Sequence, residues 1–322
     1  MICLISLIRV LFLLLSDKLL GFTLSNYMKN RITMVANTEH LQTRLLPNFV
    51  WPAGKKCAVA IGWHVDGEAG PIAADPRNAH HLAALSEGAY GVSTGMPRIL
   101  DLHRELAIPA SFFIPGYVAE LHPAMVRAVI QAGHEVAHHG YMHENVFTLD
   151  EAAERSAFVR GDAILENLTG QRPVGWSAPG WGLRASTIEI LIEMGMLYDC
   201  SLMEYDVPYL IESPAGSLVE LPISLILDDW EIFGGSLFPN GGGVNAPAEH
   251  AYQIWREEFD GLRYYGGLFS TTFHPNLLGR PARLRMLHRL FSYMKSFDDV
   301  WWATYAEIAA YVRAQAATEP AP

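Results

Sequence analysis

Short apolar runs alternate with longer stretches of helical periodicity along most of the chain. The apolar runs predict strands at residues 58–63, 110–114, 135–137, 174–178, 218–223, 268–273 and 300–303. The helical patterns predict helices at about 95–106, 122–132, 150–168, 185–195, 247–264, 281–296 and 304–316. Strands that alternate with helices in this way are typical of βα units around parallel strands. We therefore expect a single barrel-like α/β domain, in which active residues collect where the strands end.

Two long stretches lack a clear pattern and interrupt the βα series as candidate walls or lids of a site. The first covers residues 68–90 and the second residues 228–245. The second contains Phe233-Gly234-Gly235 and Gly241-Gly242-Gly243, which predict a mobile loop. Irregular stretches of this length are usually functional.

The amino-terminal segment differs from the rest of the chain. Residues 2–15 are almost wholly apolar, yet the stretch is too short to span a bilayer comfortably. A signal or anchor, a disordered leader, and translation from upstream with Met28 or Met34 as the true start all stay open. We expect a leader at residues 1–40, one catalytic domain at 41–316 and a tail at 317–322.

Composition narrows the class of protein. Half of the 322 residues are hydrophobic, which is enough for a sizeable core. The formal charge of −11 offers no basic surface for phosphates, so it argues against nucleic acid and favours a small neutral substrate. Cys3, Cys57 and Cys200 are too few and too far apart for a disulfide framework or a thiolate zinc site. They suggest a reducing compartment, so we expect a cytoplasmic protein unless residues 2–15 direct export.

Four histidines fall within ten positions, in the segment Gly133-His134-Glu135-Val136-Ala137-His138-His139-Gly140-Tyr141-Met142-His143-Glu144-Asn145. His139 and His143 are four apart, a spacing that on a helical turn places both rings on one face. They follow the third predicted strand, and Asp66 follows the first. Imidazole and carboxylate suit a borderline divalent cation such as zinc, and three protein ligands leave a coordination position open for water. The sequence therefore predicts a catalytic metal site.

Several ordered segments carry a family resemblance over roughly residues 47–315. They are Trp51-Pro52-Ala53-Gly54-Lys55, Val65-Asp66-Gly67-Glu68-Ala69-Gly70, Pro109-Ala110-Ser111-Phe112-Phe113, the histidine segment, Ser177-Ala178-Pro179-Gly180-Trp181, Tyr198-Asp199-Cys200-Ser201-Leu202, Phe273-His274-Pro275 and Gly279-Arg280-Pro281. With them the chain resembles the polysaccharide deacetylase (NodB-homology) family, most closely its intracellular peptidoglycan-deacetylase-like, allantoinase-like and cyclic-imide-hydrolase-like branch. The resemblance implies a distorted (β/α) barrel of about seven parallel strands. It also implies hydrolysis of an amide-type carbon–nitrogen bond with a single divalent ion, most often Zn²⁺, with Co²⁺ or Mn²⁺ as alternatives.

The resemblance also implies roles for individual residues. Asp66, His139 and His143 would hold the metal, and His274, which follows the sixth predicted strand, would be the general acid. An imidazolium suits that task if a nearby carboxylate raises its pKa.

Two further parts of the site follow from the same comparison. A backbone N–H of Gly180 or Trp181 would bind the oxyanion, and Asp228 or Asp229 would tune His274. A backbone donor aimed at the oxyanion contributes about 3 kcal/mol to transition-state stabilisation.

Two positions depart from the family pattern. His64 stands where the family has a catalytic Asp, and Ser177 stands where it has the Arg that accompanies that Asp. Losing an anion together with its cation keeps the local charge balanced, which favours an altered site over decay. His64 could be a neutral base, a further metal ligand, or a structural residue in a site whose base is Glu68. Strand alternation would place His64, Asp66 and Glu68 on one side, so it does not choose among them.

Aromatic side chains near these loops are candidates for the substrate pocket, namely Tyr90, Trp181, Trp230 and Phe233. We expect a metal-dependent hydrolase of a small amide, cyclic imide or ureide. The alternatives are an N-deacetylase of a glycan such as peptidoglycan and a catalytically inactive metal- or carbohydrate-binding protein. The expected partners are the substrate and further copies of the chain, without nucleic acid and without a stable membrane span.

Overall fold

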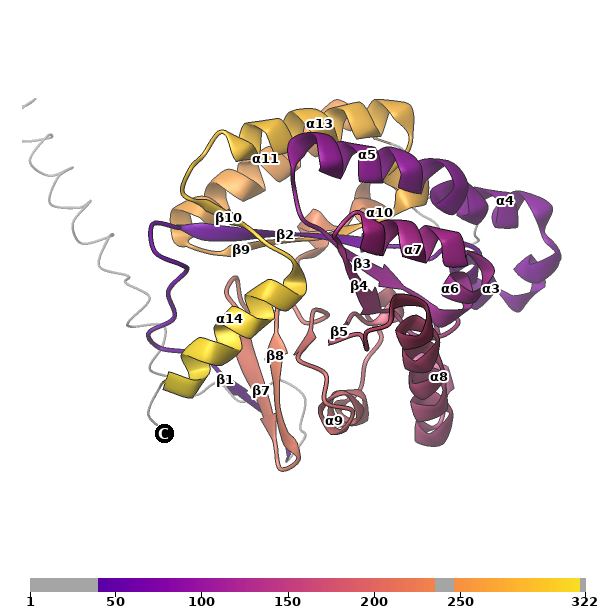
Figure 1. Ribbon diagram of the computed structural model, residues 1–322, viewed down its shortest axis with the longest axis horizontal. Helices are drawn as coiled ribbons and strands as arrows, with labels where there is room; N and C mark the ends of the chain where they lie inside the picture. Colours follow the sequence, from indigo (N-terminus) through magenta and orange to yellow (C-terminus); the bar gives the residue numbers. More distant parts are fainter. Residues whose placement is uncertain (1–39, 235–245, 319–322) are drawn as a thin grey trace, which may run out of the picture.

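A curled sheet with helices packed on both of its faces forms the frame of the molecule in this computed structural model, which describes residues 40–234 and 246–318 (Figure 1). The strand order is β1-β7-β8-β6-β5-β4-β3-β2-β10, and β9 pairs with the other edge of β2. Every neighbouring pair is parallel except those of β7, which runs antiparallel to β1 and β8. The distorted (β/α) barrel predicted from the sequence is confirmed as a curled half-barrel, and the described residues form ten strands in place of about seven.

The strands are β1 (Gln42–Arg44), β2 (Cys57–His64), β3 (Ser111–Ile114), β4 (Glu135–His138), β5 (Gly175–Trp176), β6 (Tyr198–Asp199), β7 (Tyr209–Ser213), β8 (Gly216–Glu220), β9 (Leu268–Phe273) and β10 (Val300–Trp302). The helices are α3 (Ala69–Ala74), α4 (Leu82–Tyr90), α5 (Met96–Leu106), α6 (Gly116–Leu121), α7 (Pro123–Gln131), α8 (Glu151–Thr169), α9 (Ala185–Glu193), α10 (Asp229–Phe233), α11 (Ala248–Tyr265), α12 (Pro275–Leu278), α13 (Pro281–Lys295) and α14 (Tyr305–Thr318). Shorter helical turns include η2 (Gly91–Gly95) and η4 (Pro179–Trp181).

Each strand and helix predicted from hydrophobic periodicity has a counterpart within a few residues. The strands β1, β6 and β7 and the helices α3, α4, α6, α10 and α12 were not predicted, and most of them are too short to establish a period. Treating residues 68–90 as irregular was wrong, because α3 and α4 occupy most of that stretch. Pro71 does not prevent α3, since the first N–H groups of a helix need no intrahelical partner.

Some sequence predictions fall on parts of the chain outside the described residues. These are the apolar leader, except for its last residue His40, and the glycine-rich part of the second loop, residues 235–245. The predicted tail begins later than expected, since α14 continues to Thr318. Among the described helices, none combines the length and the apolar character that crossing a membrane requires.

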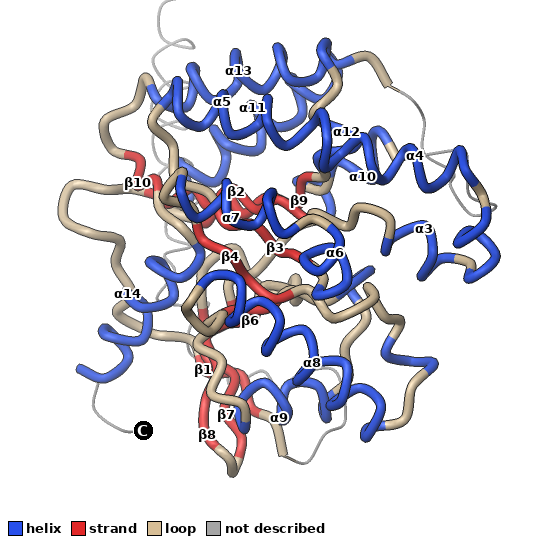
Figure 2. Tube along the Cα trace, turned by 45° about the vertical axis from the view of Figure 1, so that its right-hand side comes forward, coloured by secondary structure: helices blue, strands red, loops and turns tan. Residues whose placement is uncertain are grey.

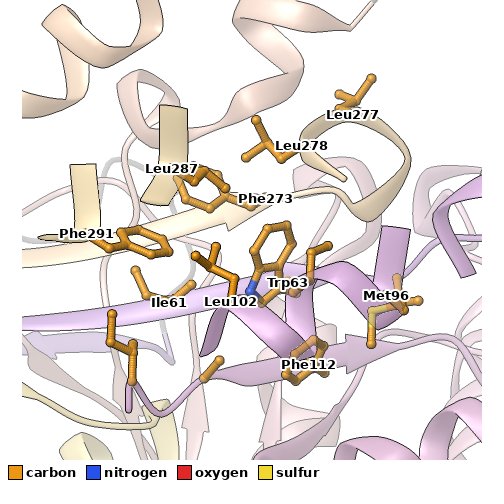
Figure 3. Packing of buried hydrophobic residues seen from close by; sticks show 14 of the residues in the cluster. Ile61, Trp63, Met96, Leu102, Phe112, Phe273, Leu277, Leu278, Leu287 and Phe291 are labelled. Atoms are coloured by element: carbon orange, nitrogen blue, oxygen red, sulfur yellow. The ribbon is translucent and has the colours of Figure 1, made fainter. Parts of the chain in front are cut away.

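The central strand β2 is buried along its whole length, as expected for a parallel strand covered on both faces. Its alternate residues Val59, Ile61 and Trp63 face the helices α5, α11 and α13, which lie side by side along one face (Figure 2). Figure 3 shows Ile61 and Trp63 among side chains of β9, α5 and α13 in this core. Ala58 and Ala60 face the opposite side, where α14 packs.

The alternation along β2 also determines the face of the sheet on which the candidate site residues lie. His64, the last residue of β2, has the parity of Ala58 and Ala60 and therefore points into the concave side of the sheet. The strands β2, β4 and β9 run in one direction, and their carboxyl ends open toward the same edge. The residues that follow these three strands are therefore brought together.

Candidate metal centre and active site

The Asp66 carboxylate lies among three imidazoles. Its Oδ1 is 3.5 Å from His139 Nε2, and its Oδ2 is 3.5 Å from both His143 Nε2 and His274 Nε2. The ligand atoms of Asp66, His139 and His143 all lie within 4.8 Å of one another. The three residues predicted as metal ligands are thus within reach of one shared ion.

Asp66 reaches this position because β2 ends two residues earlier, at His64. Val65 N–H still donates to Phe113 O of β3, after which the chain turns into α3, with the N–H groups of Ala69 and Gly70 donating to Asp66 O. The side chain is therefore anchored between the end of the sheet and the start of a helix.

His139 and His143 are held by a loop and not by the predicted helical turn. Gly140 and His143 both have positive φ, +73° and +58°, so the chain folds back on itself directly after β4. The Glu144 carboxylate accepts the N–H groups of Tyr141 and Met142 and closes the loop. The expected helical turn was wrong, although the loop does bring His139 and His143 together beside Asp66.

The donor set fits a divalent cation. His139 Nδ1–H donates to Ser177 O at 2.7 Å, which leaves the lone pair on Nε2 facing Asp66. Both His139 Nε2 and Asp66 Oδ1 are buried without a hydrogen-bond partner among the described residues. Leaving such a group unpaired costs about 1–3 kcal/mol, and a cation held between the two atoms would satisfy both. Imidazole nitrogen and carboxylate oxygen are ligands that zinc accepts.

The protonation states of His143 and Asp66, the other two candidate ligands considered, also suit a bound cation. Burial lowers the pKa of His143 to about 4, so its imidazole is neutral at neutral pH and can donate a lone pair. Burial alone would raise the pKa of Asp66, but His143, His139 and His274 hold that pKa well below its usual value. Asp66 is therefore ionised.

His274 follows β9 directly and pairs with Asp229. Its Nδ1 donates to Asp229 Oδ1 at 2.6 Å, and its backbone N–H donates to Asp229 Oδ2 at 2.9 Å. Burial by itself lowers the pKa of His274, but the Asp229 carboxylate, assisted by Asp66 and Asp228, raises it to about 10. His274 thus carries a proton at neutral pH, and its Nε2 faces Asp66.

The neighbouring aspartate has a different part in the structure. Asp228 Oδ1 accepts the Trp230 N–H at the start of α10, and its Oδ2 accepts the Trp181 indole N–H at 3.3 Å. Burial raises the pKa of Asp228 to about 7. Of the two aspartates proposed from sequence, Asp229 is the direct partner of His274.

His64 lies at the base of the same cluster. Its ring centroid is 4.5 Å from that of His139 and 5.6 Å from that of His274. Its Nε2 is 3.5 Å from Ser177 Oγ, so the two positions that depart from the family pattern touch each other. Burial, together with His139 and His274, holds the pKa of His64 well below its usual value. A neutral imidazole here can accept a proton or bind a cation.

Glu68 is not placed to act as the base. It follows the turn after Asp66, where strand alternation has ended, and its carboxylate contacts His122 Nε2 at 2.9 Å. It is absent from the cavity wall although Gly67 and Gly70 are part of it. The expectation that alternation would carry Glu68 into the site was wrong.

The turn at Pro179–Trp181 lies on the other side of the cluster. Gly180 and Trp181 both have positive φ, +56° and +60°, and both line the cavity. Trp181 N–H already donates to Ala178 O at 3.1 Å, within the turn. Of the two backbone donors considered for the oxyanion, Gly180 is therefore the better candidate.

A cavity of about 540 Å³ opens above these residues, within the usual size of a small-molecule site. Trp181 and Trp230 line it, as expected. Tyr90 does not, because its hydroxyl bonds Gly279 O and the Arg98 guanidinium. Phe233 does not line it either, since it is buried in the core against Trp255. These two pocket predictions were wrong.

Other residues of the cavity wall were not found from the sequence. They include Glu87, Asn145, Phe147, Glu231 and Asn276. Asn145 is the last residue of the histidine segment and Asn276 follows His274 by two positions, which could have signalled them. Glu87 had no such signal.

Comparisons with known proteins find similar sequences and similar solved structures. A model of the polysaccharide deacetylase family matches residues 87–198. A peptidoglycan deacetylase of Helicobacter pylori is 31% identical over 252 residues, which cover 70% of this chain and 86% of that protein. A solved Mycobacterium smegmatis protein assigned to the polysaccharide deacetylases is 41% identical with a TM-score of 0.81, covering 85% of this chain and 96% of its own. The solved PuuE allantoinase is 28% identical with a TM-score of 0.74, and the match covers 92% of this chain and 99% of the allantoinase chain.

Proposed function

The chain belongs to the polysaccharide deacetylase family of amide-bond hydrolases, and from this premise we propose that it is a metal-dependent hydrolase of a small amide, cyclic imide or ureide. The observation that carries the proposal is the convergence of Asp66, His139 and His143 on one point that His274 also faces. A binding protein would need the ligands but would not need a protonated acid beside them.

In this proposal Asp66, His139 and His143 hold one divalent ion, with Zn²⁺ as the first candidate and Co²⁺ or Mn²⁺ as alternatives. A bound ion of this kind makes water nucleophilic near neutral pH and polarises a carbonyl oxygen. The His139 ring is oriented from outside the ligand set, because Ser177 O accepts its Nδ1–H and leaves Nε2 exposed.

The remaining residues of the cluster move protons and stabilise charge. His64, neutral and buried beside His139, accepts a proton from the attacking water. The competing roles for His64 are those of a further metal ligand and of a purely structural residue. Gly180 N–H faces the oxyanion. His274 Nε2 then gives its proton to the departing nitrogen, while Asp229 holds Nδ1–H and keeps the ring oriented.

The cavity walls favour a small substrate. Helices α3 and α4 close one side beside Asp66 with Gly70, Pro71, Ala73, Ala74 and Glu87. Such a wall limits how far a polymer can extend past the reacting bond. Similarity to the PuuE allantoinase supports the same substrate class.

Deacetylation of an N-acetylated glycan is the second candidate. Similarity to a peptidoglycan deacetylase supports it, as do the aromatic side chains of Phe147, Trp181 and Trp230 in the cavity wall, on which a sugar ring can stack.

The test is turnover by metal-stripped protein after addition of Zn²⁺, Co²⁺ or Mn²⁺, on matched panels of cyclic imides, ureides, simple amides and N-acetyl sugar oligomers. Metal-dependent opening of a small ring or amide supports the proposal. Activity on sugars alone would establish the second candidate, and no turnover with any metal would leave an inactive metal- or carbohydrate-binding protein.

A further inference from the structure

Two polar side chains from distant parts of the chain meet in the cavity wall. Glu87 lies on α4 and Asn276 on α12, 189 positions apart, and Asn276 Nδ2 donates to Glu87 Oε1 at 2.8 Å. Both residues line the cavity that also holds Asp66 and His274. Among the described residues no hydrogen bond links either side chain to Asp66, His139 or His143.

The position of Asn276 relative to His274 is fixed by close packing. Helix α12 begins directly after His274 and lies against η2. A Cβ on Gly95 would stand 2.4 Å from Pro275 O, and one on Gly91 would stand 2.9 Å from Asn276 N. Backbones that approach this closely cannot shift easily, so Asn276 lies at a constant offset from the catalytic imidazole.

The pair combines an acceptor with a donor. A carboxylate only accepts hydrogen bonds, and Glu87 has a second oxygen besides the one that binds Asn276. An asparagine amide has two N–H donors, and one of the two is committed to Glu87. The pair therefore offers one acceptor and one donor side by side.

The charges of the cavity restrict what can bind there. Its lining includes the carboxyl groups of Asp66, Glu87, Asp228 and Glu231, whereas His274 supplies a positive charge and no Lys or Arg is among the described lining residues. Beside Glu87, a carboxylate or phosphate on the substrate would be repelled, whereas an uncharged group rich in N–H would not.

We propose that Glu87 and Asn276 form a subsite for the cis amide edge of a cyclic imide or ureide, with the ring N–H donating to Glu87 and the adjacent carbonyl accepting from Asn276. In a ring the N–H and C=O of an amide are forced onto the same side, and the edge matches the pair. The acyclic amide of an N-acetyl sugar is trans, so its N–H and C=O point in opposite directions. This inference rests on the proposed function and selects the cyclic substrates within it.

The experiment compares three substrates: a five-membered ring with a free N–H, its N-methyl analogue, and an isomer methylated on carbon as a control for size. For the metal-loaded wild type we expect kcat/KM to fall at least about tenfold on N-methylation, mainly through KM, and much less on C-methylation. This discrimination should shrink to about threefold or less in both variants: Glu87→Gln puts an N–H donor in place of the second carboxylate oxygen, and Asn276→Leu removes the donor that orients Glu87. Glu231→Gln, which changes another carboxylate of the wall, should keep it.

Two failures are distinguishable. If the wild type opens the rings without discriminating between them, or if both Glu87→Gln and Asn276→Leu keep the discrimination while binding metal normally, the subsite is overturned and the proposed function stands. If the wild type opens no ring and deacetylates N-acetyl sugars, the proposed small-ring function fails and the subsite fails with it. If one of the two variants does not fold, the other decides alone, and retained discrimination with normal metal binding in it overturns the subsite.

Discussion

Replacing Asp229 with asparagine should lower the pKa of His274, so that its imidazolium loses the proton at a lower pH than in the wild type. Asp229→Asn keeps the shape of the side chain but removes the charge that lies 2.6 Å from His274 Nδ1. The alkaline limb of the rate profile, where the acid loses its proton, should therefore move to lower pH.

The size of the effect follows from the pKa. Burial lowers the pKa of His274, yet its carboxylate neighbours raise it from 6.5 to about 10, and Asp229 is the largest of these favourable contributions. The difference of about 3.5 pKa units corresponds to about 5 kcal/mol. Asp66 and Asp228 remain in the variant, so we expect the alkaline limb to fall by about 1–2 pH units. At pH 10 and above the rate should therefore drop by about 10- to 10²-fold, one factor of ten for each unit of the shift.

The assay is kcat/KM from about pH 5 to pH 10 for the wild type, Asp229→Asn and the control Glu231→Gln, with bound metal measured in each. The control removes a charge from the same helix without touching His274. Partial recovery of Asp229→Asn at acid pH, with metal content unchanged, supports the assignment. An alkaline limb at the wild-type position in Asp229→Asn would refute it.

Three further changes test other parts of the site. His64→Ala should lower kcat by about 10²-fold with metal retained if His64 is the base; loss of metal would make it a ligand, and unchanged turnover would remove it from the mechanism. Treatment with a chelator should abolish turnover and lower the melting temperature, and Zn²⁺ should restore both, because the ion satisfies groups that are otherwise buried and unpaired; activity that survives complete removal would contradict the metal requirement. Gly88→Ala should destabilise the fold by about 1–3 kcal/mol and raise KM, as its Cβ would stand 2.2 Å from Gly67 O beside Asp66. Its matched control is Gly261→Ala on α11, where nothing lies within 4 Å and the melting temperature should hold or rise.

The parts of the site that follow strands could be predicted from the sequence. Asp66, His139 and His274 come directly after or close behind β2, β4 and β9, and the carboxyl ends of parallel strands meet at one edge. Knowing the order of strands and helices was therefore enough to bring these residues together.

The remaining parts depend on which way short helices and loops turn. Tyr90 and Phe233 have the chemistry of pocket residues, but each points from its helix into other packing. Asp228 and Asp229 are adjacent in sequence, and only the start of α10 decides which of them faces His274.

Side-chain pairs between distant parts of the chain could not be predicted from the sequence either. The bond between Glu87 and Asn276 requires α4 and α12 to pack against the same turn, and nothing in either segment signals the other. Short helices set by tertiary packing carry too few residues for a periodic pattern.

The most direct test of the account is the amount of metal bound by Asp66→Asn. Metal-stripped wild type, Asp66→Asn and Glu231→Gln would each be equilibrated with limiting Zn²⁺ and a competing chelator, dialysed, and analysed for metal per chain. The wild type and Glu231→Gln should retain about one ion. Asp66→Asn should bind the ion at least about tenfold more weakly, because it replaces the charged ligand that faces both His139 and His143. Equal binding by Asp66→Asn and the wild type, or no binding by the wild type, would contradict the central claim.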